Sequence, residues 1–522
     1  MSRSKKTKNS FKRDDKGRAV LGSAKEMAEW VKIGFEEQEK RRTLDIPFEQ
    51  QYIDLRNCVL YISYPVGIKK PSSQVFNLCD LAGIVPGIEK IEGDPNYLFE
   101  VKYDIFLNDS LLYGNFFHYV KFDRRVHMDK AVVQSTCSFF KCIFEDFAFM
   151  NGIQITGRCD FEQCEFKKGL VMQGAKADLF HFNYCSLNER LSLSRSSLNN
   201  RHIKRYHQSI EITNSRVENL NLSTFNTDGL PIYIVDTRIN GMHCDRMELD
   251  NDFCFKSCKM DGVMTFVKGD ERSSCIKKME FFGCTIVAQC HIEDFGIERF
   301  QFSFSKVEDS GRLRLSQCVI GELTAECSSV FGQMDLTGND IRSIGLEGTT
   351  IQGLLNFQDN IVKHYADRLT LCLLKNEALK VNDDVAATQL YAKEMNILLA
   401  DKKKPFGDKA SLWIYKLFSG FGDNWAQAFF VTFGLSVILT GLMLGCGSSK
   451  YAFRLDGEFM GVGPFVTSLL DSINVFSIPL FRDTIKEYDL NVLGQILYFF
   501  IKVVVAYGTY QFVVAFRKYG RM

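Results

Sequence analysis

A repeated spacing of apolar residues between about residues 110 and 362 constrains the fold of this chain more than any other feature. Apolar residues recur two and then five positions apart, and successive groups of three begin ten to thirteen residues apart. Six consecutive groups are Phe300, Phe302 and Val307; Leu313, Leu315 and Ile320; Leu323, Ala325 and Val330; Met334, Leu336 and Ile341; Ile344, Leu346 and Ile351; and Leu355, Phe357 and Val362. Self-similarity of this kind is the signature of a stacked repeat architecture.

The spacing predicts a parallel β-helix. Residues two apart point to the same side of an extended segment, and a step of five places the next apolar residue beyond a corner. Four such faces would close a square coil of about twenty residues, stacked in parallel on its neighbours. A small residue stands two positions before the third apolar residue of each group: Ser305, Cys318, Ser328, Asn339, Thr349 and Asn360. We expect these residues at the corners.

The same alternation predicts which side chains enter the core. Leu315 and Leu336 should point inward, whereas Arg314 and Asp335 should point outward and tolerate replacement by Ala. An ordinary β-sandwich is the alternative fold, but it needs reversing turns rich in Gly, Pro and Asn. Only one proline, Pro231, lies between Tyr97 and Lys404, so the β-helix is favoured.

The repeat resembles that of pentapeptide-repeat proteins. Their unit has a central Leu or Phe with a small residue two positions before it, and the version here is degenerate and rich in Phe and Cys. The resemblance covers about residues 110–362, and its specificity lies in the number of repetitions. It implies a right-handed, quadrilateral β-helix.

Other segments flank this repeat. We expect a basic flexible tail over 1–18, an amphipathic helix over 19–44, a capping region over 45–109, the β-helix over 110–362, a helical hairpin and an interfacial helix over 363–422, a two-span membrane domain over 423–516, and a basic cytoplasmic tail over 517–522. The second helix of the hairpin should begin at Asn382-Asp383-Asp384, because Asn and Asp side chains cap helix starts.

Two apolar stretches predict membrane spans. The residues between Asp423 and Lys450 carry no charge, and a second run from Asn491 to Phe516 is interrupted only by Lys502. Basic residues precede the first stretch and follow the second: Lys402, Lys403, Lys404, Lys409, Lys416, Arg517, Lys518 and Arg521. This bias predicts a multi-pass protein of the cell inner membrane with both termini and the β-helix in the cytoplasm. The 17 cysteines would then be reduced thiols.

The segment between the spans predicts a re-entrant loop over 461–481. A helix from Pro464 to about Asn474 would be followed by the extended piece Val475–Leu480 and then by the second span. This order resembles that of two-span ion channels, although the potassium-filter motif Thr-Val-Gly-Tyr-Gly is absent from the sequence. The resemblance implies a pore without identifying an ion. The candidate pore-lining residues are Asn474, Ser477, Gln495, Lys502 and Thr509.

Lys502 is the most unusual of these residues. Gln495 and Thr509 lie seven positions before and after it, so the three would share one stripe of a helix. Three accounts stay open. Lys502 could reach an interface by snorkelling, pair with Asp471, or line a water-filled path among several copies, where a ring of ammonium groups would favour anions.

Other residues that could carry chemistry give weaker signals. The pairs Cys137/Cys142, Cys159/Cys164 and Cys254/Cys258 are spaced four or five apart, which could indicate zinc, but five is also the step of the repeat. The eight His are scattered, and no glycine loop follows a strand as a phosphate site requires. We therefore expect no catalytic residue, no metal, no cofactor and no enzymatic activity.

Two insertions, Asn199–Gln208 and Lys268–Lys278, interrupt the repeat. The first carries Arg201, Lys204 and Arg205, which are candidates for binding a protein partner, with a solvated loop as the alternative. The balance of 64 basic against 63 acidic residues argues against nucleic acid.

Two hypotheses of function follow. The first is an ion-channel-like homo-oligomer in the lipid bilayer with a cytoplasmic sensing or assembly β-helix, resembling bacterial membrane proteins that join these parts. The alternative is a membrane-tethered interaction scaffold without transport activity.

Overall fold

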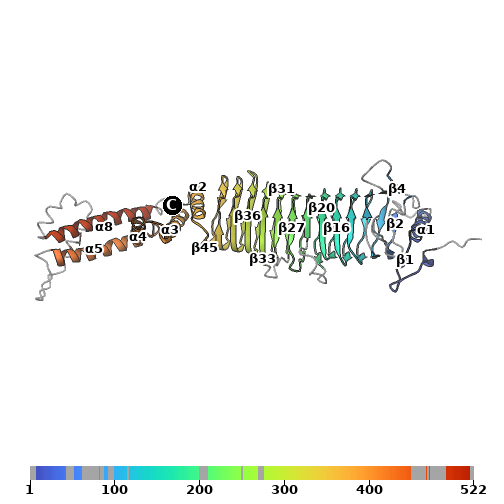
Figure 1. The fold of residues 1–522 in the computed structure, drawn as a ribbon, viewed down its shortest axis with the longest axis horizontal. Helices are drawn as coiled ribbons and strands as arrows, with labels where there is room; N and C mark the ends of the chain where they lie inside the picture. The colour runs from blue at the N-terminus through green and yellow to red at the C-terminus, as the bar shows by residue number, and fades with distance from the viewer. Residues whose placement is uncertain are drawn as a thin grey trace, which may run out of the picture. The chain divides into compact units, whose positions relative to one another are not determined.

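The computed structural model describes residues 7–42, 52–61, 82, 87–91, 99–113, 117–198, 210–247, 251–268, 275–447, 466, 469–470 and 490–517. The chain divides into two compact units, Met1–Ala366 and Asp367–Met522 (Figure 1). Strands β1 to β45 belong to the first unit, and helices α2, α3, α4, α5 and α8 belong to the second.

The first unit is a parallel β-solenoid of about 11 turns with about 22 residues in each turn. Equivalent strands of successive turns pair in parallel, so that Val126 lies beside Ile105 on one side and Ala148 on the other. Stacking produces sheets of 7, 13, 12 and 13 strands. The predicted β-helix is therefore confirmed. Its turn is slightly longer than twenty residues because some steps between inward residues are six instead of five, as from Val133 to Phe139 and from Phe144 to Met150.

The number of strands in a turn changes along the solenoid. An early turn has four strands, β10 (Val126–His127), β11 (Val132–Val133), β12 (Cys137–Phe140) and β13 (Ile143–Phe144). The seven-stranded sheet ends at β23 (Ser197–Leu198), and a later turn has only β36 (Gly296–Ser303), β37 (Lys306–Val307) and β38 (Arg312–Ser316). The four inward positions of the coil remain, because Ile297, Phe302, Val307 and Leu315 are all buried. One long strand, β36, therefore covers two faces, with a corner between Ile297 and Phe300.

Columns of identical or similar residues fill the solenoid core. Phe117, Phe139, Phe161 and Phe182 are stacked with successive ring centroids 5.0, 4.9 and 5.1 Å apart. Parallel in-register pairing stacks such rings with their planes nearly parallel, and offset-stacked pairs add to the gain from burial. Leu315 and Leu336 are likewise paired in register and fully buried. Their predicted inward orientation is confirmed.

A ladder of small polar residues, which we call the corner ladder, lines one corner of the solenoid. It consists of Cys142, Cys164, Cys185, Ser215, Thr237, Cys258, Cys284, Ser305, Ser328 and Thr349. Nearly every member donates to a backbone carbonyl of the preceding turn, as Ser328 Oγ does to Phe302 O at 2.8 Å. Burial raises the pKa of Cys164 well above its usual value, so its thiol keeps the proton that it donates.

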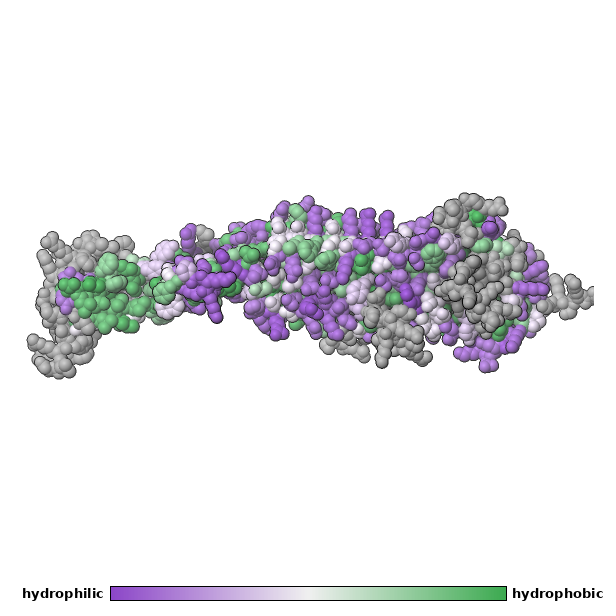
Figure 2. Space-filling view, viewed as in Figure 1, coloured by the Kyte–Doolittle hydropathy of each residue, from purple (hydrophilic) through white to green (hydrophobic). Residues whose placement is uncertain are grey.

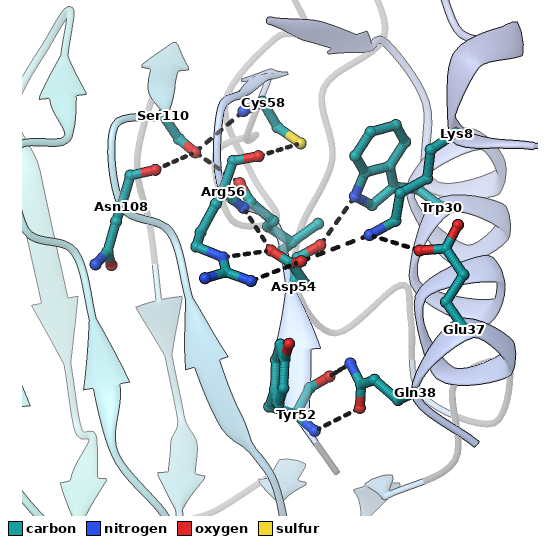
Figure 3. A network of polar contacts seen from close by, with 11 residues as sticks. Lys8, Trp30, Glu37, Gln38, Tyr52, Asp54, Arg56, Cys58, Asn108 and Ser110 are labelled. Atoms are coloured by element: carbon teal, nitrogen blue, oxygen red, sulfur yellow. Dashed lines mark hydrogen bonds and ion pairs between the residues drawn. The ribbon is translucent and has the colours of Figure 1, made fainter. Parts of the chain in front are cut away.

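Helix α1 (Ala24–Arg42) lies against β2 (Tyr52–Asp54), the first strand of a 13-stranded sheet. The Gln38 amide donates to Tyr52 O at 2.8 Å and accepts from Tyr52 N at 3.1 Å. Trp30 Nε1 donates to Asp54 O at 2.8 Å (Figure 3). Side chains therefore take the place of a further strand, and the free edge of β2 is closed against pairing with other chains.

The second unit contains α2 (Arg368–Lys380), α3 (Asp384–Ala400), α4 (Phe406–Ser419), α5 (Trp425–Gly447) and α8 (Val492–Arg517). Helices α2 and α3 form a hairpin. Asp383 caps α3 by accepting a hydrogen bond from Ala386 N at 2.9 Å, as the sequence predicts. Asp367 caps α2 in the same way through Thr370 N at 2.7 Å.

Candidate membrane site

Helices α5 and α8 contain the apolar segments Trp425–Gly445 and Val492–Arg517, which are long and apolar enough to cross a membrane by length and composition. Their exposed side chains are large and hydrophobic: Phe429, Phe430, Phe433, Ile438, Leu442, Ile496, Phe499, Phe500, Val503 and Val513. Figure 2 shows a hydrophobic surface over these two helices. Contiguous apolar surface of this kind is unusual in contact with water and typical of contact with lipid.

The two helices pack antiparallel along a seam of small residues. The ring of Trp425, at the start of α5, lies 6.1 Å from the rings of Phe512 and Phe516 near the end of α8. A Cβ at Gly508 would overlap the side chain of Thr432, so the backbones approach closely where both residues are small. At the other end the contact is made by larger residues, Met443, Leu444, Leu490, Tyr498, Ile501 and Val505.

Helix α4 is joined to α8 by a buried hydrogen bond and to α5 by exposed ones. Ser419 Oγ donates to Gln511 Oε1 of α8 at 3.0 Å and accepts from Gly422 N at 2.9 Å. Gln427 of α5 donates to the carbonyl oxygens of Lys416 and Leu417. Trp413, Ile414 and Leu417 are exposed on the outer side of α4, which is the pattern of a helix lying in a membrane interface.

Gln495, Lys502 and Thr509 lie along one side of α8, outside the face that packs on α5. The buried face consists of Gly494, Tyr498, Ile501, Val505, Gly508, Gln511 and Ala515. Gln495 and Lys502 are half-buried beside that face, and Thr509 is exposed. Lys502 Nζ lies 5.3 Å from the centroid of the Tyr498 ring, one turn nearer the start of α8. We call these three residues the polar stripe.

The remaining predicted lining residues cannot be placed on this stripe. Asn474, Ser477 and Asp471 lie outside the described residues, as does the rest of the predicted loop 461–481 apart from Val466, Leu469 and Leu470.

Helix α5 contributes polar groups that sequence reasoning missed. Thr432 and Ser436 line a cavity of about 150 Å³ together with Gly508, Thr509 and three phenylalanines. Their hydroxyls donate to the carbonyl oxygens one turn earlier, Ala428 O at 2.6 Å and Thr432 O at 2.7 Å. The signal that could have found them is the four-residue spacing of Thr432, Ser436 and Thr440 within an otherwise apolar span.

The α2–α3 hairpin holds a buried carboxylate. Glu394 accepts from Lys375 Nζ at 2.8 Å, Cys372 Sγ at 3.0 Å and Arg368 Nε at 2.9 Å. Burial by itself would raise the pKa of Glu394, but the hydrogen bonds from these three donors outweigh it and hold the pKa below its usual value. The group therefore acts as a charged link between the two helices.

The candidate partner-binding residues Arg201, Lys204 and Arg205 lie outside the described residues. The insertion that carries them leads directly into β24 (Ile210–Thr213), and the second insertion leads into β33 (Cys275–Phe282), both in the 12-stranded sheet. Because Cys275–Lys278 pairs with β36, the second insertion is shorter than predicted. Both insertions therefore come immediately before strands of the 12-stranded sheet.

The cysteine spacing follows from the solenoid. Cys142, Cys164 and Cys258 belong to the corner ladder, and Cys137 and Cys159 are core residues paired in register. Within the described ranges, no group of three or more His, Cys, Asp or Glu residues is arranged to hold a metal ion. The chain matches no protein-family model, no curated protein and no solved structure.

Proposed function

We propose that the chain is a pentapeptide-repeat-type solenoid protein that α5 and α8 anchor in the inner membrane of a bacterium, and that several copies surround an ion path. The observation that carries this proposal is the position of Lys502, in the middle of α8 and outside the α5 interface. A charged side chain at the centre of a span costs about 2.5–3.5 kcal/mol on insertion scales unless it faces protein or water. Gln495 and Thr509 continue the polar stripe on the same side of α8, as the wall of a water-filled path among several copies would.

Assembly is needed because two helices are too few to enclose a water-filled path. If α8 faces the axis of a homo-oligomer, Gln495, Lys502 and Thr509 would line the path, and a ring of ammonium groups would favour anions. The basic residues Lys402, Lys403, Lys404 and Arg517 favour a cytoplasmic position for the α4 end of the spans. The solenoid would then be a cytoplasmic sensing or assembly part, with no catalytic role.

Planar-bilayer recordings test this proposal. Purified Lys502→Glu should keep the oligomeric state of the parent chain and shift the reversal potential in a salt gradient toward cations. Lys416→Glu, which makes the same charge change at the exposed surface of α4, should shift it much less. Unchanged selectivity of Lys502→Glu would remove this residue from the wall of the path, and a monomeric protein in detergent would contradict the assembly.

A membrane-tethered scaffold is the second candidate. It is favoured by the apolar outer faces of α5 and α8 and by the hydroxyls of Thr432 and Ser436, which are already bonded within α5. In this case Arg201, Lys204 and Arg205, next to β24, would bind a protein partner. The absence of current from purified oligomer in every lipid and at every voltage would favour the scaffold.

A further inference from the structure

An open cavity of about 380 Å³ lies among α2, α3, the connection between α4 and α5, and the end of α8. Its size is within the range of about 300–1,000 Å³ that is common for small-molecule sites. Its polar lining comes from Lys375, Asp384, Thr388, Tyr391, Tyr415 and Arg517. Residues of α2, α3, α4, the connection between α4 and α5, and α8 thus meet at one hollow, and neither proposed function uses it.

The cavity offers donors suited to a phosphate group. Arg517 has a planar guanidinium that can bind two phosphate oxygens at once, and none of the described acidic residues forms an ion pair with it. Lys375 Nζ adds a second cation, 5.4 Å from the centroid of the Tyr391 ring. Tyr391 and Tyr415 supply hydroxyl donors.

The acidic groups nearby do not cancel this charge. Glu394 is shared between Lys375 and Arg368, so that group keeps one net positive charge. Among the lining residues, Asp384 is the single acidic one, against Lys375 and Arg517. The cavity and its supporting charges therefore carry a net positive charge, which favours an anion over a cation or a zwitterion.

The position of the cavity identifies where the anion would come from. Arg517 is the last residue of α8, directly after the exposed apolar residue Phe516, and Trp425 begins α5 at the same end. Tryptophan at the ends of spans marks the level of lipid headgroups. Val514 lines the cavity and also belongs to the exposed apolar surface of α8, so a molecule bound at Arg517 could extend acyl chains along that helix.

We propose that this cavity binds the phosphate headgroup of an anionic phospholipid at the cytoplasmic surface of the membrane. The proposal rests on membrane insertion through α5 and α8 but not on ion conduction. Basic pockets at the cytoplasmic ends of membrane helices are suited to anionic lipid headgroups. A bound lipid would link the α2–α3 hairpin to α8 through one phosphate.

The test uses purified full-length protein in detergent, with dioleoyl phosphatidylglycerol as the probe and dioleoyl phosphatidylcholine for comparison, counted by native mass spectrometry. We expect one saturable phosphatidylglycerol per chain. Arg517→Gln should bind it about tenfold more weakly, the change expected for losing a hydrogen bond to a charged group. Thr388→Trp, which fills the cavity without changing its charge, should weaken binding similarly. Lys416→Gln, an exposed basic residue at the same end, should not.

Four outcomes would overturn the proposal. Equal binding of phosphatidylcholine would show no headgroup selection, and equal losses in Arg517→Gln and Lys416→Gln would show diffuse attraction to a basic surface. Unchanged binding by Thr388→Trp would place the lipid elsewhere. Displacement by inorganic phosphate at millimolar concentration would identify a soluble anion as the ligand. Retention of Arg517→Gln in carbonate-washed membranes separates these results from a failure of membrane insertion.

Discussion

Asp335 lies on the outer side of its strand and yet is only 2% exposed. Arg312 Nε forms an ion pair with one carboxylate oxygen, and Gln333 Nε2 donates to the other at 2.8 Å. Arg314, its neighbour in the previous turn, is exposed. The prediction that Asp335 tolerates replacement is therefore corrected. Strand alternation predicts the side to which a residue points, whereas burial also depends on the long side chains beside it.

Replacing Asp335 with Ala should destabilise the solenoid by about 1–3 kcal/mol, because a buried, charge-assisted pair is lost. The matched change Arg314→Ala should stay within about 0.5 kcal/mol. Urea unfolding of both variants, followed by circular dichroism, provides the measurement. Equal free energies of unfolding for the two variants would show that the ion pair between Arg312 and Asp335 does not contribute to stability.

Ser328 joins its own turn of the corner ladder to the preceding turn by two hydrogen bonds. Its hydroxyl donates to Phe302 O and accepts from Ser305 N at 3.1 Å. Ser328→Ala would leave this buried N–H without its acceptor and should cost about 1–3 kcal/mol. Ser328→Cys should cost less, because Cys already occupies equivalent positions such as Cys284. The same unfolding experiment measures both, and a smaller effect of Ala than of Cys would contradict the role of the hydroxyl.

At the scale of elements, strand positions could be predicted because each triad marks two inward residues and a corner. The change from four strands to three could not, since the triad of β36 and β37 is the same as in a four-strand turn. The difference lies upstream, where Ile297 is five residues before Phe302 but Val133 is six before Phe139, so the shorter corner lies within one continuous strand, β36. The cap at Asp383 could be predicted because it depends on a side chain and its own helix.

The α2–α3 hairpin should lose stability in acid through Glu394. Its pKa is held below the usual value of 4.5 by its three hydrogen-bond donors, so the stabilisation is complete above that pH and is lost as the pH falls through the lower folded value. Hydrogen exchange of the hairpin amides, measured between neutral pH and pH 3, should show this loss. Glu394→Gln should be less protected at neutral pH and should lack the transition. An unchanged transition in this variant would assign it to another carboxylate.

The close contact of Gly508 with Thr432 should make the packing of α5 against α8 sensitive to a larger side chain at position 508. Gly508→Ala introduces a Cβ into the space of the Thr432 side chain and should lower the thermal stability of the purified protein in detergent. The double change Gly508→Ala with Thr432→Ala should recover part of the loss, because the smaller partner leaves room. Equal melting temperatures of the parent and Gly508→Ala would show that the two helices make room for the added Cβ without losing stability.

For the whole molecule, the sequence predicted which residues of α8 share the polar stripe, but it did not predict how the surrounding helices pack. The polar stripe could be predicted because seven residues make about two turns of any helix. The seam at Gly508, the cavity beside Arg517 and the α4 hydrogen bonds could not, since each depends on how separate helices pack. Propensity and hydropathy carry no information about such pairings.

The proposed topology can be tested with a thiol label that does not cross membranes. A Cys placed at Gly457 should react in intact cells, because that segment would lie outside, and a Cys placed at Arg521 should react only after permeabilisation. The native thiols of Cys275 and Cys327, which are exposed on the solenoid, are internal controls and should behave like position 521. Labelling of the native thiols in intact cells would reverse the orientation.

Parallel stacking makes the solenoid a rod whose length is counted in whole turns. About 11 turns at a strand spacing of about 4.8 Å give roughly 50 Å. Leu313 and Met334 occupy the same position in successive turns, so removal of residues 313–333 would join equivalent points of the coil. The rod would become one rung shorter while every remaining column stayed in line. The length of the solenoid could therefore be changed by whole turns, in steps of about 4.8 Å, without a change to either end.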